Sequence, residues 1–172
     1  ITTYEKTNIT EIDYFTLDKP SKTWLKKFFF GLSRKYDWGK ELRWYLQKEY
    51  SDSFDKPLIS RNNIMNNDIG YLEYHSSRNT DILQEYFVPA SKLTTFIDEL
   101  RETVKENDLN LLSATIRYIP KNDESVLSYS NEEVFGVVIY FNVDLGENEQ
   151  KEVERWTQEI TDVSLNNGGT YY

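Results

Sequence analysis

Two hydrophobic periods alternate along the second half of the sequence, and this alternation limits the possible folds most strongly. From Ile82 onward, period-two stretches and period-3.6 stretches follow one another in the order strand, helix, strand, strand, helix, strand. Pro89 closes the first strand and Gly168-Gly169 ends the second helix. The order predicts an α+β domain of the split βαβ (ferredoxin-like) type, with an antiparallel sheet, helices on one face and a truncated last strand. The predicted strands are Ile82–Val88, Leu111–Ile119, Val134–Val143 and Thr170–Tyr172, and the predicted helices begin at Ser91 and cover Glu147–Leu165.

The first half of the sequence predicts further strands and helices around this core. We expect one domain over residues 1–172, with an N-terminal extension (1–80) and a split βαβ core (81–172). The chain begins at Ile1 and stops just after a Gly-Gly pair, so we expect it to be a piece of a longer protein. Within the extension, the patterns predict one or two strands in 2–17, a helix opened by Pro20-Ser21, a second helix from Trp38 to Glu49, a loop over 51–68 and a strand at Gly70–His75.

Composition and charge exclude several classes of function. The net charge of −9 argues against a nucleic-acid binder, which needs a surplus of Lys and Arg. The chain has no cysteine and a single histidine, His75, so we expect neither thiol chemistry nor a metal site. No apolar stretch approaches the ~20 residues of a membrane span, and we expect a cytoplasmic protein without one. Aromatic residues make up 15% of the sequence, enough for a packed core.

Sorting the central strands by alternation separates an apolar face from a polar one. In one strand Leu111 and Ile119 flank Ser113, Thr115 and Arg117, and in the next strand Tyr140 and Asn142 share a face. The opposite faces are apolar and should bury against the two helices; they comprise Leu112, Ala114, Ile116, Tyr118, Phe135, Val137, Ile139, Phe141 and Val143.

The polar face allows two interpretations. Hydroxyls, an amide and one guanidinium among apolar neighbours suit a surface that binds a hydroxyl-rich ligand. Alternatively, Arg117 pairs with a carboxylate on an ordinary exposed sheet face. On the preceding strand, either Gln84 or Glu85 must point to this face, and the two faces of that strand are equally apolar, so alternation does not decide between them.

Five segments resemble the C-terminal, substrate-binding domain of FAD-linked oxidases of the vanillyl-alcohol-oxidase type, in the aldonolactone and alditol oxidase branch. The likeness covers about residues 60–172, and the order and spacing of its segments carry it. These segments are Leu72–Ser76, Asp81–Pro89, Thr115–Tyr118, Val138–Asn142 and Gly168–Tyr172.

The resemblance implies a function and a set of site residues. It implies an oxidoreductase that removes hydride from a CH–OH group of a sugar, polyol or aldonolactone-like substrate, with FAD held mainly by another domain of the same protein. Arg117 keeps the family's arginine near the flavin and stands as the catalytic and cofactor-facing residue, with Tyr140 as a second catalytic candidate. We assign Ser113, Thr115, Asn142, Gln84 and Glu85 to substrate binding.

The sequence also departs from the family pattern. Thr115 stands where these relatives have a glutamate, and Tyr140 and Asn142 stand where they have a histidine and a threonine. The proton acceptor is therefore not identified, and we expect the 172 residues alone to be inactive. The alternative function is a non-catalytic, ferredoxin-like module that binds a ligand or a protein.

Overall fold

The computed structural model describes residues 5–7, 16–19, 22–50, 58–66, 69–124, 128 and 130–172. The chain separates into two compact units, Ile1–Glu73 and Tyr74–Tyr172. This division lies seven residues before the expected boundary between the extension and the core. We still predict, without a test, that both units belong to one substrate-binding domain.

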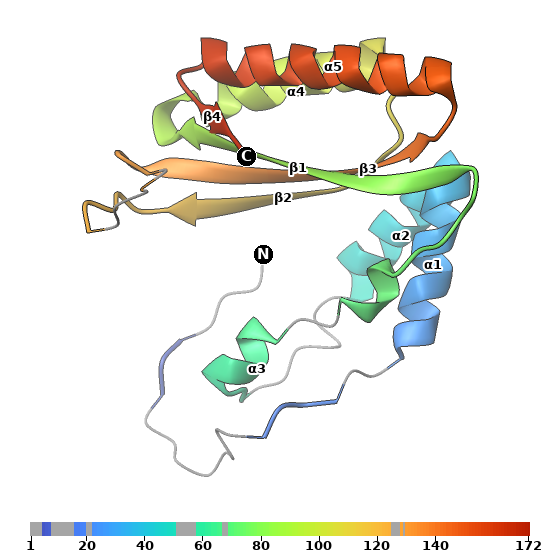
Figure 1. Ribbon diagram of the computed structural model, residues 1–172. Coiled ribbons are helices and arrows are strands. Elements are labelled where there is room, and N and C mark those ends of the chain that lie inside the picture. Colours follow the sequence, from blue (N-terminus) through green and yellow to red (C-terminus); the bar gives the residue numbers. More distant parts are fainter. Residues whose placement is uncertain are drawn as a thin grey trace. The chain divides into compact units, whose positions relative to one another are not determined.

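The second unit has the predicted β-α-β-β-α-β order. Its elements are β1 (Asn79–Pro89), a short η3 turn (Ala90–Lys92), α4 (Leu93–Glu106), β2 (Leu111–Ile119), β3 (Val134–Asp144), α5 (Glu147–Asn166) and β4 (Thr170–Tyr171). The strands pair antiparallel in the order β2-β3-β1-β4. Both helices lie over the same face of the sheet (Figure 1). The predicted α+β fold with a split βαβ sheet is confirmed.

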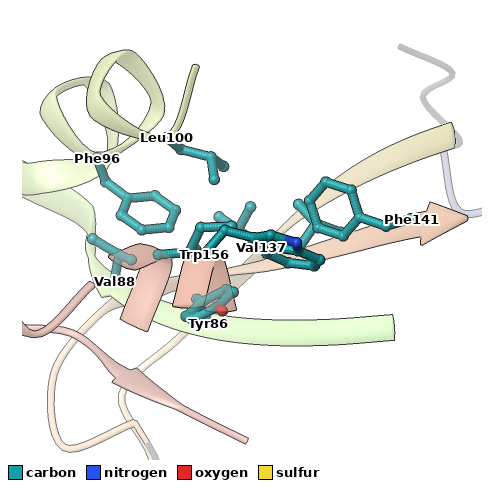
Figure 2. Packing of buried hydrophobic residues seen from close by; sticks show 9 residues of the cluster. Tyr86, Val88, Phe96, Leu100, Val137, Phe141 and Trp156 are labelled. Carbon is teal, nitrogen blue, oxygen red and sulfur yellow. The ribbon is translucent and has the colours of Figure 1, made fainter. Parts of the chain in front are cut away.

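The core fills the space between the sheet and these helices. Val137, Ile139 and Phe141 of β3 are buried against Trp156 of α5, and the Phe141 and Trp156 rings lie 5.0 Å apart between centroids. Figure 2 shows Phe96 and Leu100 of α4 completing the same cluster. The alternation of β3 therefore buries one face as predicted, and burial of these large apolar side chains is the main source of stability.

Polar groups inside this layer are hydrogen-bonded to each other. The Tyr86 hydroxyl donates to Gln84 Oε1 at 2.9 Å, and Gln84 Nε2 donates to Thr157 Oγ1 of α5 at 2.8 Å. Burial raises the pKa of Tyr86 above its usual value, against a smaller lowering by a hydrogen bond with Thr161. At the C-terminal end of α5, Asn167 Nδ2 donates to Glu99 of α4 at 2.6 Å, which ties α5 to α4.

Two glycines turn the chain from α5 into β4. Gly168 has φ 73°, which L side chains rarely adopt, and its N–H donates to Leu165 O at 2.9 Å. A Cβ on Gly169 would lie 2.7 Å from Phe87 O and 2.7 Å from Ser164 Oγ. The helix stop predicted at this pair is confirmed, and the close approach of the backbones requires glycine at position 169.

The edge strand β2 departs from the predicted alternation. A β-bulge interrupts its pairing with β3 between Leu111 and Ser113, so Leu111 stands opposite Phe141 and packs on the core instead of the polar face. Ala114, Ile116 and Tyr118 are exposed, and the expectation that they bury against the helices was wrong. The helices pack on β1 and β3 and leave this edge uncovered. Tyr118 instead hydrogen-bonds Glu133, which is the first cause of its raised pKa.

The first unit is built around a helical pair, α1 (Thr23–Lys35) and α2 (Asp37–Tyr50). Phe30 is its buried centre: the guanidinium carbons of Arg34 and Arg43 lie 4.5 Å from its ring centroid, and the Tyr71 ring packs edge-on at 5.3 Å. A Cβ on Gly39 would lie 2.5 Å from Leu32 O, so the two helices meet closely at their corner. Both predicted helices are confirmed.

Three other expectations for the extension are not confirmed. Gly70–His75 is not a strand, because Leu72 and Glu73 donate to Ile69 O and Gly70 O and form the 3₁₀ turn η2 (Gly70–Leu72). The loop over 51–68 contains α3 (Arg61–Met65), capped by Ser60, whose side chain accepts from Asn63 N at 3.2 Å.

Most of the predicted strand region 2–17 lies outside the described residues. In the described ranges, no helix has both the length and the apolar character needed to cross a bilayer.

Candidate functional site

The sheet face opposite α4 and α5 gathers most of the predicted site residues. Residues paired across strands share a face, so the register defines three successive rows. We call this surface the outer face. Its rows are Ser113–Tyr140–Leu83, Thr115–Val138–Glu85 and Arg117–Gly136–Phe87, each running from β2 through β3 to β1.

Glu85 lies on the outer face, which settles the choice that alternation left open. Gln84 points the other way, into the helix layer, where its amide bonds Thr157 and Tyr86. The sheet itself therefore separates Gln84 from the other predicted substrate-binding residues. Its side chain serves the packing of α5 on β1.

Gly136, at the centre of the outer face, leaves room on β3 that side chains of the neighbouring strands fill. A Cβ built at this position would lie 3.1 Å from Ile119 Cδ1, 3.5 Å from Phe87 Cε1 and 3.6 Å from Glu85 Oε1. The Glu85 carboxylate therefore leans from its own strand over β3, into the row of Arg117. A larger residue on β3 would occupy the space that the carboxylate now uses.

Arg117 stands on β2 directly opposite Gly136 and is exposed. Within the described part of the chain, its guanidinium makes no ion pair or hydrogen bond. Arg117 is exposed, so both interpretations of the polar face, a ligand surface and an ordinary solvated face, stay predictions. The Glu85 carboxylate reaches over Gly136, and Arg117 is the register partner of the same glycine on β2.

Asn142 is held by the fold. Its Nδ2 donates to Asp81 Oδ1 at 2.7 Å and to Thr80 O at 3.3 Å, and the residue is buried. Because both amide hydrogens are used, only its Oδ1 can accept a hydrogen bond from a ligand. Asn142 therefore fits a positioning role for the end of β3 better than a flexible ligand contact.

The remaining predicted residues line one side of the outer face. Thr115 is exposed, Ser113 and Tyr140 are half-buried, and Ser113 faces Tyr140 directly across the strand pair. Their hydroxyls can both donate and accept, as recognition of a hydroxylated molecule requires. Together with Arg117 and Glu85, they provide donors, acceptors and both signs of charge on one surface.

Sequence reasoning missed the part played by Gly136. A glycine inside a strand pattern signals a bulge or a close approach, and this signal was present in Val134–Val143. It did not show which side chains would use the space. The role of Asp81 as the hydrogen-bond partner of Asn142 was also missed, because the two residues become neighbours only through the pairing of β1 with β3.

Among the described residues, no group of three His, Asp or Glu side chains is arranged to hold a metal ion. The chain contains no cysteine.

Comparison with known proteins yields little. No protein-family model matches the chain, and no curated protein matches it. Among solved structures, a C-terminal segment of the alpha subunit of aIF2 from Pyrococcus abyssi aligns over 87% of this chain and 91% of that chain, with 13% identity and a TM-score of 0.31. A superposition this distant supports no statement about function.

Proposed function

We propose that residues 74–172 form the substrate-facing part of an FAD-dependent oxidoreductase that oxidises a CH–OH group of a sugar, polyol or aldonolactone-like compound. The observation that carries the proposal is the outer face, where the Glu85 carboxylate reaches over Gly136 and Arg117 stands opposite Gly136 on β2, unpaired within the described residues. The segments that resemble the FAD-linked oxidases supply the strands of this same face. FAD would be held mainly by a domain outside these residues, since the sequence contains no glycine-rich phosphate-binding motif.

The residues present suit a polar substrate beneath a flavin ring. The absence of a side chain at Gly136 lets the Glu85 carboxylate reach over β3 toward the row of Arg117. β1 and β2 lie on either side of β3, about 10 Å apart, so a ring-sized substrate over β3 could contact side chains from both strands. When bound, the flavin would supply the acceptor for the hydride that leaves the substrate carbon.

Glu85 is the proton acceptor in this proposal. Oxidation of an alcohol to a carbonyl removes a hydroxyl proton along with the hydride, and a carboxylate can take that proton. Thr115 cannot replace the glutamate that the related oxidases carry at its position. Glu85 stands in the same row, one strand beyond Val138, and its carboxylate is directed over β3.

Arg117 stabilises the substrate oxygen as negative charge develops on it. Its guanidinium is not committed to another group in the described structure, so it can serve a ligand without breaking an existing bond. Tyr140 donates a hydrogen bond to a neighbouring substrate hydroxyl, with Ser113 and Thr115 beside it.

The proposal is tested with a protein that contains residues 1–172 together with its flanking sequence. It should purify yellow or take up added FAD, and a panel of polyols, aldoses and aldonolactones should bleach the flavin anaerobically. Glu85→Gln, which keeps the shape and removes the base, should slow this bleaching by about a hundredfold or more. The matched control is Glu154→Gln, an exposed glutamate on α5, which should bleach at the unmodified rate.

Absence of flavin binding would reject the proposal. The remaining candidate would then be a non-catalytic ferredoxin-like binding module using the same surface. Exposed Leu83, on the row of Tyr140, would suit that function as an apolar contact.

A further inference from the structure

Strand β2 is an open edge of the sheet in residues 74–172. The strand order β2-β3-β1-β4 places it at one end of the sheet, whereas β4 at the other end is only two residues long. After the bulge, β2 pairs regularly with β3 from Ser113 to Ile119, and Pro120 follows. Short strands, lysines and prolines normally protect such edges against pairing with another chain. The regular stretch contains neither lysine nor proline, so it offers a long edge to a further strand.

The backbone of β2 turns three residues toward this open edge. In an antiparallel strand, the N–H and C=O of one residue point to the same side, and successive residues alternate. Asn142 N donates to Asn110 O at 3.1 Å, so the even-numbered residues of β3 face β2. The register then assigns the odd-numbered residues of β2 to the bonds with β3. The N–H and C=O groups of Ala114, Ile116 and Tyr118 therefore point outward, and within the described residues they make no hydrogen bond.

The side chains of the same three residues add an apolar surface to the edge. All three are exposed on the helix side of the sheet, Ile116 at 48% and Tyr118 at 53%, because α4 and α5 pack on β1 and β3. Arg117 is the one charged residue of the regular stretch, and it stands on the outer face with its backbone turned to β3. The edge thus combines outward-pointing donors and acceptors with an uncharged row of side chains.

We infer that two copies of this chain pair antiparallel along β2, about a twofold axis at Ile116. Ile116 is the midpoint of the regular stretch, so this register gives the fullest overlap of the two strands. It also sets the outward-pointing residues opposite each other, as the hydrogen bonds of an antiparallel pair require. Ile116 meets Ile116, and the small side chain of Ala114 meets the large one of Tyr118. The stretch is its own complement, which selects a second copy as the occupant.

Charge favours the same register. An axis at residue 117 would set two arginines directly opposite each other, which destabilises a strand pair. With the axis at Ile116, each Arg117 stands opposite Thr115 of the other copy, whose hydroxyl can accept a hydrogen bond.

The size of the contact predicts a reversible dimer. Strands paired over residues 113–119 run side by side for about 23 Å. Such a contact buries on the order of 1,000 Å² in total, the lower limit for a specific interface. We therefore expect dimers to form and dissociate with concentration.

Pairing would join two four-stranded sheets into one, with a continuous outer face. Arg117 of one copy would then lie beside Thr115 of the other, so each proposed substrate-binding surface gains a guanidinium from its neighbour. The inference itself does not depend on the proposed oxidation chemistry, because strand pairing needs only the backbone and side chains of the edge.

The test measures the mass of the 172-residue chain by analytical ultracentrifugation from about 1 µM to about 500 µM. We expect a shift from the 20.5 kDa monomer to a species of twice that mass as the concentration rises. A chain that stays monomeric at the highest concentration would overturn the inference, and the edge would then be left to an extended segment of a different protein.

Charge variants locate the contact and its register. Ile116→Lys sets two ammonium groups opposite each other at the axis and should weaken the dimer about tenfold or more. Its matched control, Leu165→Lys, changes an apolar residue of α5 that is 49% exposed, and should dimerise as the unmodified chain does. Thr115→Glu faces Arg117 of the other copy and should tighten the dimer about threefold, whereas Thr115→Lys should weaken it about threefold. Circular dichroism verifies that each variant remains folded.

A disulfide tests the axis directly. The chain has no cysteine, so a single substitution gives a defined probe. Cα atoms of a hydrogen-bonded antiparallel pair lie about 5.5 Å apart, within the range of a disulfide. Ile116→Cys should therefore form a covalent dimer under mild oxidation about tenfold faster than Leu165→Cys. Equal rates for the two variants, a dimer unaffected by Ile116→Lys, or the same effect of both charges at Thr115 would overturn the inference.

Discussion

The two faces of the sheet in residues 74–172 are built from the same strands but treat their polar side chains differently. On the helix side, the polar groups of Gln84, Tyr86 and Thr157 are joined to each other beneath α5. On the outer face, the Glu85 carboxylate reaches over Gly136, and Arg117 is exposed and unpaired within the described residues. A buried polar group must be paired to keep the fold stable, whereas a binding surface needs groups whose partners come from a ligand. Neighbouring residues such as Gln84 and Glu85 can therefore have unrelated roles.

The comparison predicts that substitutions on the helix side cost stability. Trp156→Ala removes the largest side chain that α5 places in the core and should lower the free energy of unfolding by about 3–5 kcal/mol. Trp44→Ala, at an exposed tryptophan, is the control and should change it by less than about 0.5 kcal/mol. Urea denaturation measures both, and equal effects would mean that the core is not where the structure places it.

The corner between α5 and β4 gives the next largest effect. Gly169→Ala brings a Cβ to 2.7 Å from the backbone oxygen of Phe87, which has no flexible side chain to move aside. We expect a loss of about 1–3 kcal/mol in thermal or urea unfolding. Gly31→Ala, where a Cβ would meet nothing within 4 Å, should be neutral or stabilising. The same loss in both variants would contradict the close packing at residue 169.

A smaller effect with a defined pH dependence is expected at Tyr86. Burial raises its pKa in the folded state, so the neutral phenol is favoured there. Its stabilising contribution is complete below the unfolded value of about 10 and is lost as the pH rises through the higher folded pKa. Tyr86→Phe should cost about 0.5–1.5 kcal/mol at neutral pH through the lost bond to Gln84, and should flatten the alkaline fall in stability. An unchanged alkaline slope would show that other groups cause it.

Periodicity predicted the order of the elements, because each strand and helix of the second unit buries one face against the same core. It could not predict the details that depend on pairing. The bulge at Leu111–Ser113 and the side of the sheet taken by Glu85 follow from the register between strands. Ile116 and Tyr118 were expected inside because they are apolar, but they lie on an edge strand that the helices do not reach. Periodicity also could not predict which side chains fill the room beside Gly136, because Ile119, Phe87 and Glu85 come from other parts of the chain.

The most direct test of the outer face measures stability and chemistry on one variant, Arg117→Ala, in a protein that contains the flanking sequence. Because Arg117 is exposed and unpaired within the described residues, the free energy of unfolding should change by less than about 0.5 kcal/mol. The rate at which substrate bleaches the flavin should fall by about a hundredfold or more. A destabilised protein, or a stable one with an unchanged bleaching rate, would contradict the assignment of this face to the reaction.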